Sequence, residues 1–212
     1  MAASLTKIKD SYIEYLLEHG QQPPTVFAFA KKLKIKEADF YEYYNSFEQI
    51  ESSVWLGFFE DTLARLRNDE VYETYSVREK LLAFYYTWIE TLTSNRSFVI
   101  RSVEESRKQR SLRTPSALAE FKYQFEKFVK DLMAEGRESR EVQSRRLIEN
   151  KYPDAFWLQT LWLLDFWSKD TSKGFEKTDT AIEKAVNMAF DLLGASALDS
   201  ALDLAKFVYQ NR

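Results

Sequence analysis

The segment Lys34–Ile50 reads KIKEADFYEYYNSFEQI, and its pattern decides how the first fifty residues fold. Four large apolar side chains recur at the spacing of one face of short helices: Ile35, Phe40, Tyr44 and Ile50. Ser46 interrupts the pattern and is a typical helix N-cap residue. We therefore predict a short helix over 36–44, a turn, and a long helix that begins near Phe47 and runs to about Arg67.

Two more helices are predicted before this segment. The first covers 5–19 and is followed by Gly20, a typical helix stop. The second covers 25–33, with Thr25 as its N-cap. Ala30 is small where two helices of a helix-turn-helix would cross closely. Three short helices followed by a long one therefore predict a small helical head at the N-terminus.

Residues 5 to about 60 resemble the DNA-binding domain of TetR-family regulators. The signature of that family reads approximately I-A-x-x-x-G-V-S-x-G-T-L-Y-x-H-F-x-S-K-E-x-L. This chain follows it without a gap: Phe29-Ala30 stands at I-A, Lys34-Ile35-Lys36 at G-V-S, Ala38-Asp39-Phe40-Tyr41 at G-T-L-Y, Tyr43-Tyr44 at H-F, and Ser46-Phe47-Glu48-Gln49-Ile50 at S-K-E-x-L. The ungapped register is more specific than any single match within it.

The resemblance implies an all-α fold with two domains. Residues 1–50 would form a three-helix helix-turn-helix (HTH) DNA-binding domain. A long helix would join it to a larger helical domain, residues 51–212, which holds a ligand pocket. The last two long helices of that domain would pair with a second copy as a four-helix bundle, so the partners implied are a DNA operator, a second copy of the chain and a small molecule.

The surface expected to face DNA departs from the family pattern at several positions. The turn glycine is replaced by Lys34, and the lysine that opens the long helix is replaced by Phe47. The recognition helix carries three carboxylates, Glu37, Asp39 and Glu42, which are unfavourable near phosphates. Residues 1–50 hold six lysines against seven acidic residues. The remaining candidate DNA contacts are Thr25, Lys34, Lys36, Tyr41 and Tyr43.

The rest of the chain is also expected to be helical. Only 5 Gly and 4 Pro occur among 212 residues, and apolar residues repeat with helical spacing. The expected helices cover 76–93, 96–106, 115–135, 154–168, 179–193 and 196–210. The last has an apolar stripe that would cover the dimer bundle; a membrane-surface role is not expected, because its polar face is not cationic.

Aromatic residues make up 16% of the chain, which suggests a bulky core, a lined cavity or a large partner interface. The candidate residues for an apolar ligand site are Phe84, Trp88, Phe98, Phe125 and Trp162. More distant candidates are Tyr85, Phe128, Trp157, Leu161 and Phe166. An aromatic stripe of this kind more often forms plain core or a dimer interface, so these interpretations stay open at this point.

Several kinds of chemistry are not expected. The chain has no Cys and a single His, His19, so disulfides, thiolate metal sites and multi-histidine metal sites are excluded. No nucleophile–base arrangement or phosphate-binding glycine loop is visible. We expect a non-enzyme without cofactor or metal. The connector with Arg107, Lys108, Arg110 and Arg113 could bind an acidic partner or an anionic headgroup, but a solvated loop is the preferred interpretation.

Localisation follows from similar observations. The N-terminus lacks the order of a signal peptide, and the most apolar run, 156–167, is too short and too polar to span a bilayer. The net charge of −3 gives no global attraction to nucleic acid. We expect a cytoplasmic protein.

Two functions follow from these patterns. The first is a homodimeric TetR-like transcriptional regulator that responds to a small apolar ligand. The second is a lipid- or isoprenoid-binding protein with the TetR fold that no longer binds DNA. The segment FWSKDTSKGFEKTDTAIEKAV, residues 166–186, faintly resembles lipid-binding accessory proteins of ubiquinone biosynthesis. The acidic recognition helix favours the second function, and the lysine cluster and intact HTH register favour the first.

Overall fold

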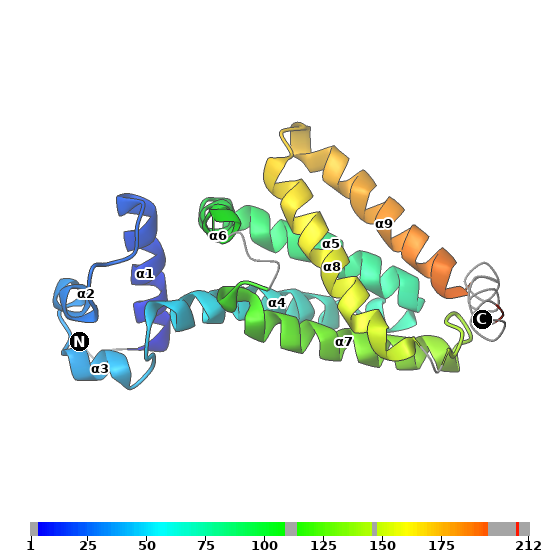
Figure 1. The fold of residues 1–212 in the computed structure, drawn as a ribbon, viewed down its shortest axis with the longest axis horizontal. Coiled ribbons are helices and arrows are strands. Elements are labelled where there is room, and N and C mark those ends of the chain that lie inside the picture. The colour runs from blue at the N-terminus through cyan, green and yellow to red at the C-terminus, as the bar shows by residue number, and fades with distance from the viewer. Residues whose placement is uncertain (1–3, 109–113, 146–147, 195–206, 208–212) are drawn as a thin grey trace. The chain divides into compact units, whose positions relative to one another are not determined.

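The computed structural model describes residues 4–108, 114–145, 148–194 and 207, and the regular elements in this part of the chain are helices (Figure 1). The α-helices are α1 (Leu5–His19), α2 (Val26–Leu33), α3 (Glu37–Tyr41), α4 (Phe47–Arg67), α5 (Val77–Ser94), α6 (Arg96–Lys108), α7 (Ala119–Glu138), α8 (Tyr152–Lys169) and α9 (Glu176–Gly194). Short 3-10 turns precede several of them: η1 (Tyr72–Thr74), η2 (Ser116–Leu118), η3 (Glu149–Lys151) and η4 (Lys173–Phe175). The all-α prediction is confirmed.

The chain divides into two compact units. The first unit comprises residues 1–61 with 90–123, and the second comprises 62–89 with 124–212. Helices α4, α5 and α7 each contribute residues to both units. The unit that contains the three short helices therefore also takes in α6. The division into domains at residue 50 stays a prediction.

The first unit is built around a cluster of aromatic rings. Tyr12 of α1 stacks on Phe47 at the start of α4, with ring centroids 5.4 Å apart. Phe29 of α2 meets both rings edge-on, and Phe40 of α3 closes the cluster against Phe29 and Phe47. Burying each such ring contributes about 1.5–3 kcal/mol, so aromatic packing holds the three short helices on the first turn of α4.

Capping residues set where these helices begin and end. The Ser4 hydroxyl accepts a hydrogen bond from the Lys7 amide, and the Ser46 hydroxyl accepts one from the Gln49 amide at the start of α4. Gly20 ends α1 in the left-handed region, at φ 67°. The cap predicted at Ser46 is confirmed. Backbone groups left open at helix ends are thus satisfied locally.

The second unit has a larger aromatic core. Phe84 of α5 lies between Trp88 of the same helix and Phe125 and Phe128 of α7. The Tyr85 hydroxyl pairs with the Thr160 hydroxyl of α8 at 3.0 Å. At the edge, the nearly buried Lys80 donates to Glu135 at 2.7 Å. The core thus joins α5, α7 and α8 by ring packing and a few paired polar groups.

Helices α8 and α9 form an antiparallel pair (Figure 1). Asp170 at the end of α8 accepts hydrogen bonds from the backbone and hydroxyl of Ser172 and of Thr178, so it ties α8 to the first turn of α9. At the other end, the buried Arg145 guanidinium donates to the carbonyls of Leu192 and Leu193. A cation at a helix C-terminus is favourable, so both ends of α9 are fixed.

Candidate functional site

The turn between α2 and α3 has the geometry of a helix-turn-helix. Lys34 follows α2 with φ 58° and ψ 40°, in the left-handed region, and the Ile35 amide donates to the Ala30 carbonyl at 3.0 Å. The turn therefore keeps the conformation for which glycine is best suited, although a lysine stands there. A lysine in this conformation costs about 1–2 kcal/mol relative to right-handed backbone.

One of the three carboxylates of the recognition helix is engaged by its own helix. The Asp39 side chain accepts a hydrogen bond from the Lys36 amide at 2.9 Å, at the N-terminus of α3. A carboxylate in this place satisfies an open amide and complements the positive end of the helix dipole. Its charge is thereby partly compensated, while Glu37 and Glu42 are exposed.

Phe47 does not lie on the surface, although the lysine at this position of the TetR signature led us to expect a surface residue. Its side chain is 8% exposed and packs within the aromatic cluster of Tyr12, Phe29 and Phe40. The expectation that Phe47 belongs to the DNA-facing surface is corrected, because its ring is part of the core of the head. The physical reason is that the first turn of α4 faces the other three helices, which bury an apolar side chain placed there. That the loss of the family's lysine at this position weakens DNA binding stays a prediction.

The exposed cations around the turn differ in their surroundings. Lys32 donates to Glu18 of α1 at 3.3 Å and lies over the Tyr15 ring. Among the described residues, no ion pair is formed by Lys31, Lys34 or Lys36, and all three are exposed. The turn thus presents three ammonium groups to solvent.

The other predicted DNA contacts flank these lysines in sequence. The Thr25 hydroxyl oxygen accepts from the Ala28 amide at 3.1 Å, so it caps α2, and its own proton is available to an anion. Tyr41 and Tyr43 are both exposed. Phe27 of α2 is also exposed, and the sequence analysis did not select it. An exposed aromatic ring leaves no signal in helical periodicity that separates it from a core residue.

A polar cavity of about 550 Å³ lies in the same unit, lined by residues of α1, α4 and α6 with the segments 20–22 and 115–117. At its wall, the buried Tyr12 hydroxyl donates to Glu51 at 2.6 Å and ties α1 to α4. Burial raises the pKa of the Glu51 carboxyl above its ordinary range, although the Tyr12 hydrogen bond opposes this shift. Glu48 and Glu105 raise the pKa further, and Arg101 lowers it.

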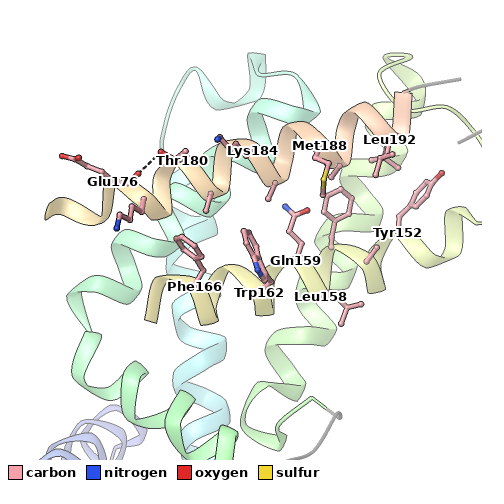
Figure 2. A pocket seen from close by; sticks show the side chains of 17 residues that line it. Tyr152, Leu158, Gln159, Trp162, Phe166, Glu176, Thr180, Lys184, Met188 and Leu192 are labelled. Carbon is pink, nitrogen blue, oxygen red and sulfur yellow. Dashed lines mark hydrogen bonds between the residues drawn. The ribbon is translucent and has the colours of Figure 1, made fainter. Parts of the chain in front are cut away.

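In the second unit, α8 and α9 enclose a groove with a cavity volume of about 1170 Å³ (Figure 2). Residues at a spacing of three or four line it from both helices. On α8 they include Tyr152, Phe156, Gln159, Trp162 and Phe166, and on α9 they include Ala181, Ala185, Met188 and Leu192. The groove is therefore a long, mostly apolar stripe on a helix pair.

Several side chains of this stripe are exposed to an unusual degree for apolar groups. Leu158 is 66% exposed and Met188 62%, and Trp162 and Leu192 are about half exposed. Contiguous exposed apolar surface on a folded protein marks an interaction site. Two polar atoms among the lining residues, the Tyr152 hydroxyl and the Gln159 amide nitrogen, are buried without a hydrogen-bond partner in the described part of the chain.

The five predicted ligand residues belong to different parts of the fold. Phe84, Trp88 and Phe125 are fully buried in the core of the second unit, where they pack on one another. Trp162 lines the α8/α9 groove. Phe98 belongs to the first unit, where it packs against Phe58. A ligand-binding role for any of these residues stays a prediction.

Two predicted features lie wholly or partly outside the described residues. Arg107 and Lys108 end α6, but Arg110 and Arg113 fall outside the described chain. The predicted helix over 196–210 also falls outside it, apart from Phe207. Within the described residues, no helix is long and apolar enough to cross a membrane, and no group of His, Asp and Glu is arranged to hold a metal ion.

A comparison with known protein families identifies the family of this chain. The family model for the tetracycline repressor-like C-terminal domain matches residues 80–208, which is more than half of the chain. The chain belongs to the TetR family. A search of curated proteins found none that matches it.

The family match covers the part of the chain where sequence motifs were least specific. It begins in α5 and extends past α9, so it includes the α8/α9 groove and most of the aromatic core of the second unit. TetR-family proteins are typically regulators and not enzymes. The HTH reading of α1–α3 rests instead on the ungapped signature and on the turn geometry at Lys34.

Proposed function

We propose that this chain is a homodimeric, cytoplasmic transcriptional regulator that binds a double-stranded DNA operator through α2 and α3. The observation that carries the proposal is the turn at Lys34. It keeps the helix-turn-helix conformation without a glycine and presents Lys31, Lys34 and Lys36 to solvent. In an HTH the second helix enters the major groove and the flanking groups contact phosphates.

The chemistry of the turn supports this role in detail. Lysines beside the turn supply the phosphate contacts on which affinity depends. Asp39 is engaged by the Lys36 amide, which reduces the repulsion expected from the recognition helix. Tyr41, Tyr43 and Thr25 offer hydroxyl groups to phosphate or base edges. Glu37 and Glu42 are unfavourable beside most DNA groups. The exception is an amino donor such as cytosine N4, from which a carboxylate can accept a hydrogen bond.

The α8/α9 face supports a dimer. A stable homodimer interface buries about 800 Å² on each partner, and it is richer in apolar side chains than the rest of a protein surface. The stripe that includes Leu158, Trp162, Met188 and Leu192 extends along both helices. A second α8/α9 pair would cover the whole stripe, whereas a small molecule would cover only part of it.

The proposed ligand is a small apolar molecule held in the second unit. The aromatic residues around Phe84, Trp88 and Phe125 would have to open to receive it, because they are fully packed. Trp162 would then belong to the dimer face, and Phe98 would belong to the first unit. Binding that favours one arrangement of the two heads would shift the DNA affinity by the same coupling free energy.

The test replaces both turn lysines. Lys34→Gln with Lys36→Gln should weaken binding to all duplex sequences, and the magnitude of the negative slope of log K against log salt should decrease by about 0.9 for each phosphate contact removed. Fluorescence anisotropy with a duplex from the region upstream of the gene measures both quantities. The matched control is Lys127→Gln with Lys130→Gln, because these exposed lysines of α7 belong to the second unit.

The outcomes separate clearly. Equal losses in both double variants would show a general charge effect and would contradict the assignment of the turn. An unchanged affinity in the Lys34/Lys36 variant, with helical content intact by circular dichroism, would contradict DNA binding through α2 and α3.

A second candidate function is a carrier of lipid or isoprenoid that has lost DNA recognition. The large apolar groove between α8 and α9 favours it, because an exposed apolar surface is also suited to a lipid tail. Native mass spectrometry distinguishes the two. A dimer mass supports the regulator, and a strict monomer with a co-purified lipid supports the carrier.

A further inference from the structure

Phe27 is an exposed aromatic residue on the basic side of α2. Its side chain is 62% exposed, and it takes part in no ring or cation–π contact among the described residues. Lys31 and Lys34 follow it at four and seven residues, and both are exposed. Residues at this spacing lie on one side of a helix. The ring and the two ammonium groups therefore form one stripe that runs along α2 to the turn.

The position of Phe27 distinguishes it from the other exposed apolar residues of the first unit. Single exposed apolar side chains, such as Leu17 of α1, are common on protein surfaces. Phe27 instead lies between two groups that can bind phosphate, the Thr25 hydroxyl two residues before it and the Lys31 ammonium four residues after it. In an HTH the first helix crosses the DNA backbone. Phosphate contacts on both sides would bring the ring onto the strand between them.

The chemistry of the ring decides which DNA group it can contact there. A phenyl ring carries no charge and no hydrogen-bond donor, so it gains little from a phosphate or a polar base edge. The apolar group that the major groove offers is the C5-methyl of thymine, and Phe is one of the side chains suited to it. This methyl projects from the side of the base that faces its own backbone. A helix that crosses the backbone can therefore cover it, which removes apolar surface from water.

We propose that Phe27 contacts a thymine methyl group at the edge of the major groove and makes each head selective for thymine over cytosine at that position. Cytosine lacks the methyl group and presents an amino donor in the groove, for which the ring has no acceptor. The recognition helix α3 presents mainly polar groups, so Phe27 adds an apolar contact from a different helix. The inference rests on the proposed DNA binding through α2 and α3 and names a base that the HTH selects.

The test removes the methyl groups from the DNA and the ring from the protein. Uracil pairs as thymine does but lacks the C5-methyl, so the upstream duplex is synthesised once with thymidine and once with deoxyuridine. Wild type should bind the uracil duplex about fourfold more weakly for each methyl contact, and about 15-fold more weakly for the two heads of a dimer. Phe27→Ala should bind the thymine duplex more weakly than wild type and should lose much less on uracil. Fluorescence anisotropy at one salt concentration measures all four affinities.

Two further variants serve as controls. Leu17→Ala removes an exposed apolar side chain of α1 in the same unit, and it should keep the wild-type ratio between the two duplexes. Phe27→Leu keeps an apolar side chain and should retain part of that ratio. A methyl contact made by another residue, or a change of DNA shape caused by uracil, would affect wild type and Phe27→Ala equally. The double-mutant cycle therefore isolates the contact of the ring.

The results separate the inference from the function on which it rests. A wild-type chain that binds neither duplex at low ionic strength would overturn both. Salt-dependent binding of equal strength to the thymine and uracil duplexes would overturn the thymine contact alone. An equal loss on uracil in wild type and Phe27→Ala would also overturn it, because the ring would then not be the group that meets the methyl.

Discussion

At the scale of single residues, Lys34 combines two roles that oppose each other. Its backbone occupies the left-handed region at φ 58°, where a side chain is disfavoured, and its ammonium group is exposed beside α3. A glycine would relieve the backbone, and it would also remove a cation from the surface proposed to meet DNA. Stability and DNA affinity should therefore respond in opposite directions to one substitution.

Lys34→Gly should raise the free energy of unfolding by about 1 kcal/mol, because glycine adopts the left-handed conformation without the steric cost. It should lower DNA affinity at the same time. Chemical denaturation followed by circular dichroism measures the first effect and anisotropy the second. Lys34→Ala is the control, since alanine keeps the backbone cost and loses the charge. Equal stability of the glycine and alanine variants would contradict strain at this turn.

The burial and contacts of single side chains were the least predictable features of the head. The cap at Ser46 and the core positions Phe40, Tyr44 and Ile50 followed from spacing. The burial of Phe47 did not, because a position aligned with a surface lysine carries no information on how an aromatic ring there will pack. The engagement of Asp39 by the Lys36 amide also depends on a helix start that periodicity locates only to within a residue or two.

At the scale of elements, helix periodicity predicted the bounds of several helices well. The predicted first helix, 5–19, is α1, and the predicted long helix from Phe47 to Arg67 is α4. The recognition helix was predicted over 36–44 but ends at Tyr41. The chain turns there, and the buried Tyr44 ring packs on Phe40 while its hydroxyl pairs with Ser53 of α4. Tertiary contact, which the sequence does not display, shortened the helix.

The α8/α9 connection falls between the predicted helices 154–168 and 179–193, and the structure shows a capping network there around Asp170. The Asp170 carboxylate is buried and accepts four hydrogen bonds from Ser172 and Thr178. Burial alone would raise its pKa, but these hydrogen bonds outweigh burial and lower it from 3.8 to about 2. The folded state therefore favours the charged carboxylate.

Asp170→Ala should destabilise the second unit by about 2–4 kcal/mol, because it removes a charged acceptor and leaves buried donors unpaired. The wild-type contribution should be complete above about pH 4 and be lost as the pH falls from about 4 to about 2, since the pKa is lowered on folding. Thermal unfolding between pH 2 and pH 7 measures this. A parallel pH dependence in wild type and variant would contradict the assignment, and Ser172→Ala should show a smaller effect of the same sign.

At the scale of the whole molecule, the family and fold were predictable, and the candidate sites were predictable only in part. The signature over residues 29–50 identified the TetR resemblance, and the match at 80–208 supports it from the other part of the chain. The five aromatic ligand candidates, by contrast, are divided among a packed core, a groove and the other unit. Aromatic content marks burial, but it does not separate a core from a pocket.

The charge of the molecule limits how it would bind DNA. The chain carries a net charge of −3, so its affinity for phosphates must come from local lysines and not from a general basic surface. Of the three exposed lysines at the turn, Lys34 and Lys36 are the predicted DNA contacts, and in the two heads of a dimer they would give four phosphate contacts. A DNA-binding protein with strongly salt-dependent affinity makes more phosphate contacts than this, about six to ten.

The salt dependence of DNA binding tests the central claim most directly. Wild-type protein and a duplex from the upstream region should give a slope of log K against log salt of about −3 to −4, for four lysine–phosphate contacts per dimer. Affinity should fall by about 100-fold between 50 and 200 mM salt, measured by fluorescence anisotropy with two chains bound per duplex. Absence of binding at low ionic strength, or an affinity that does not change with salt, would contradict the account.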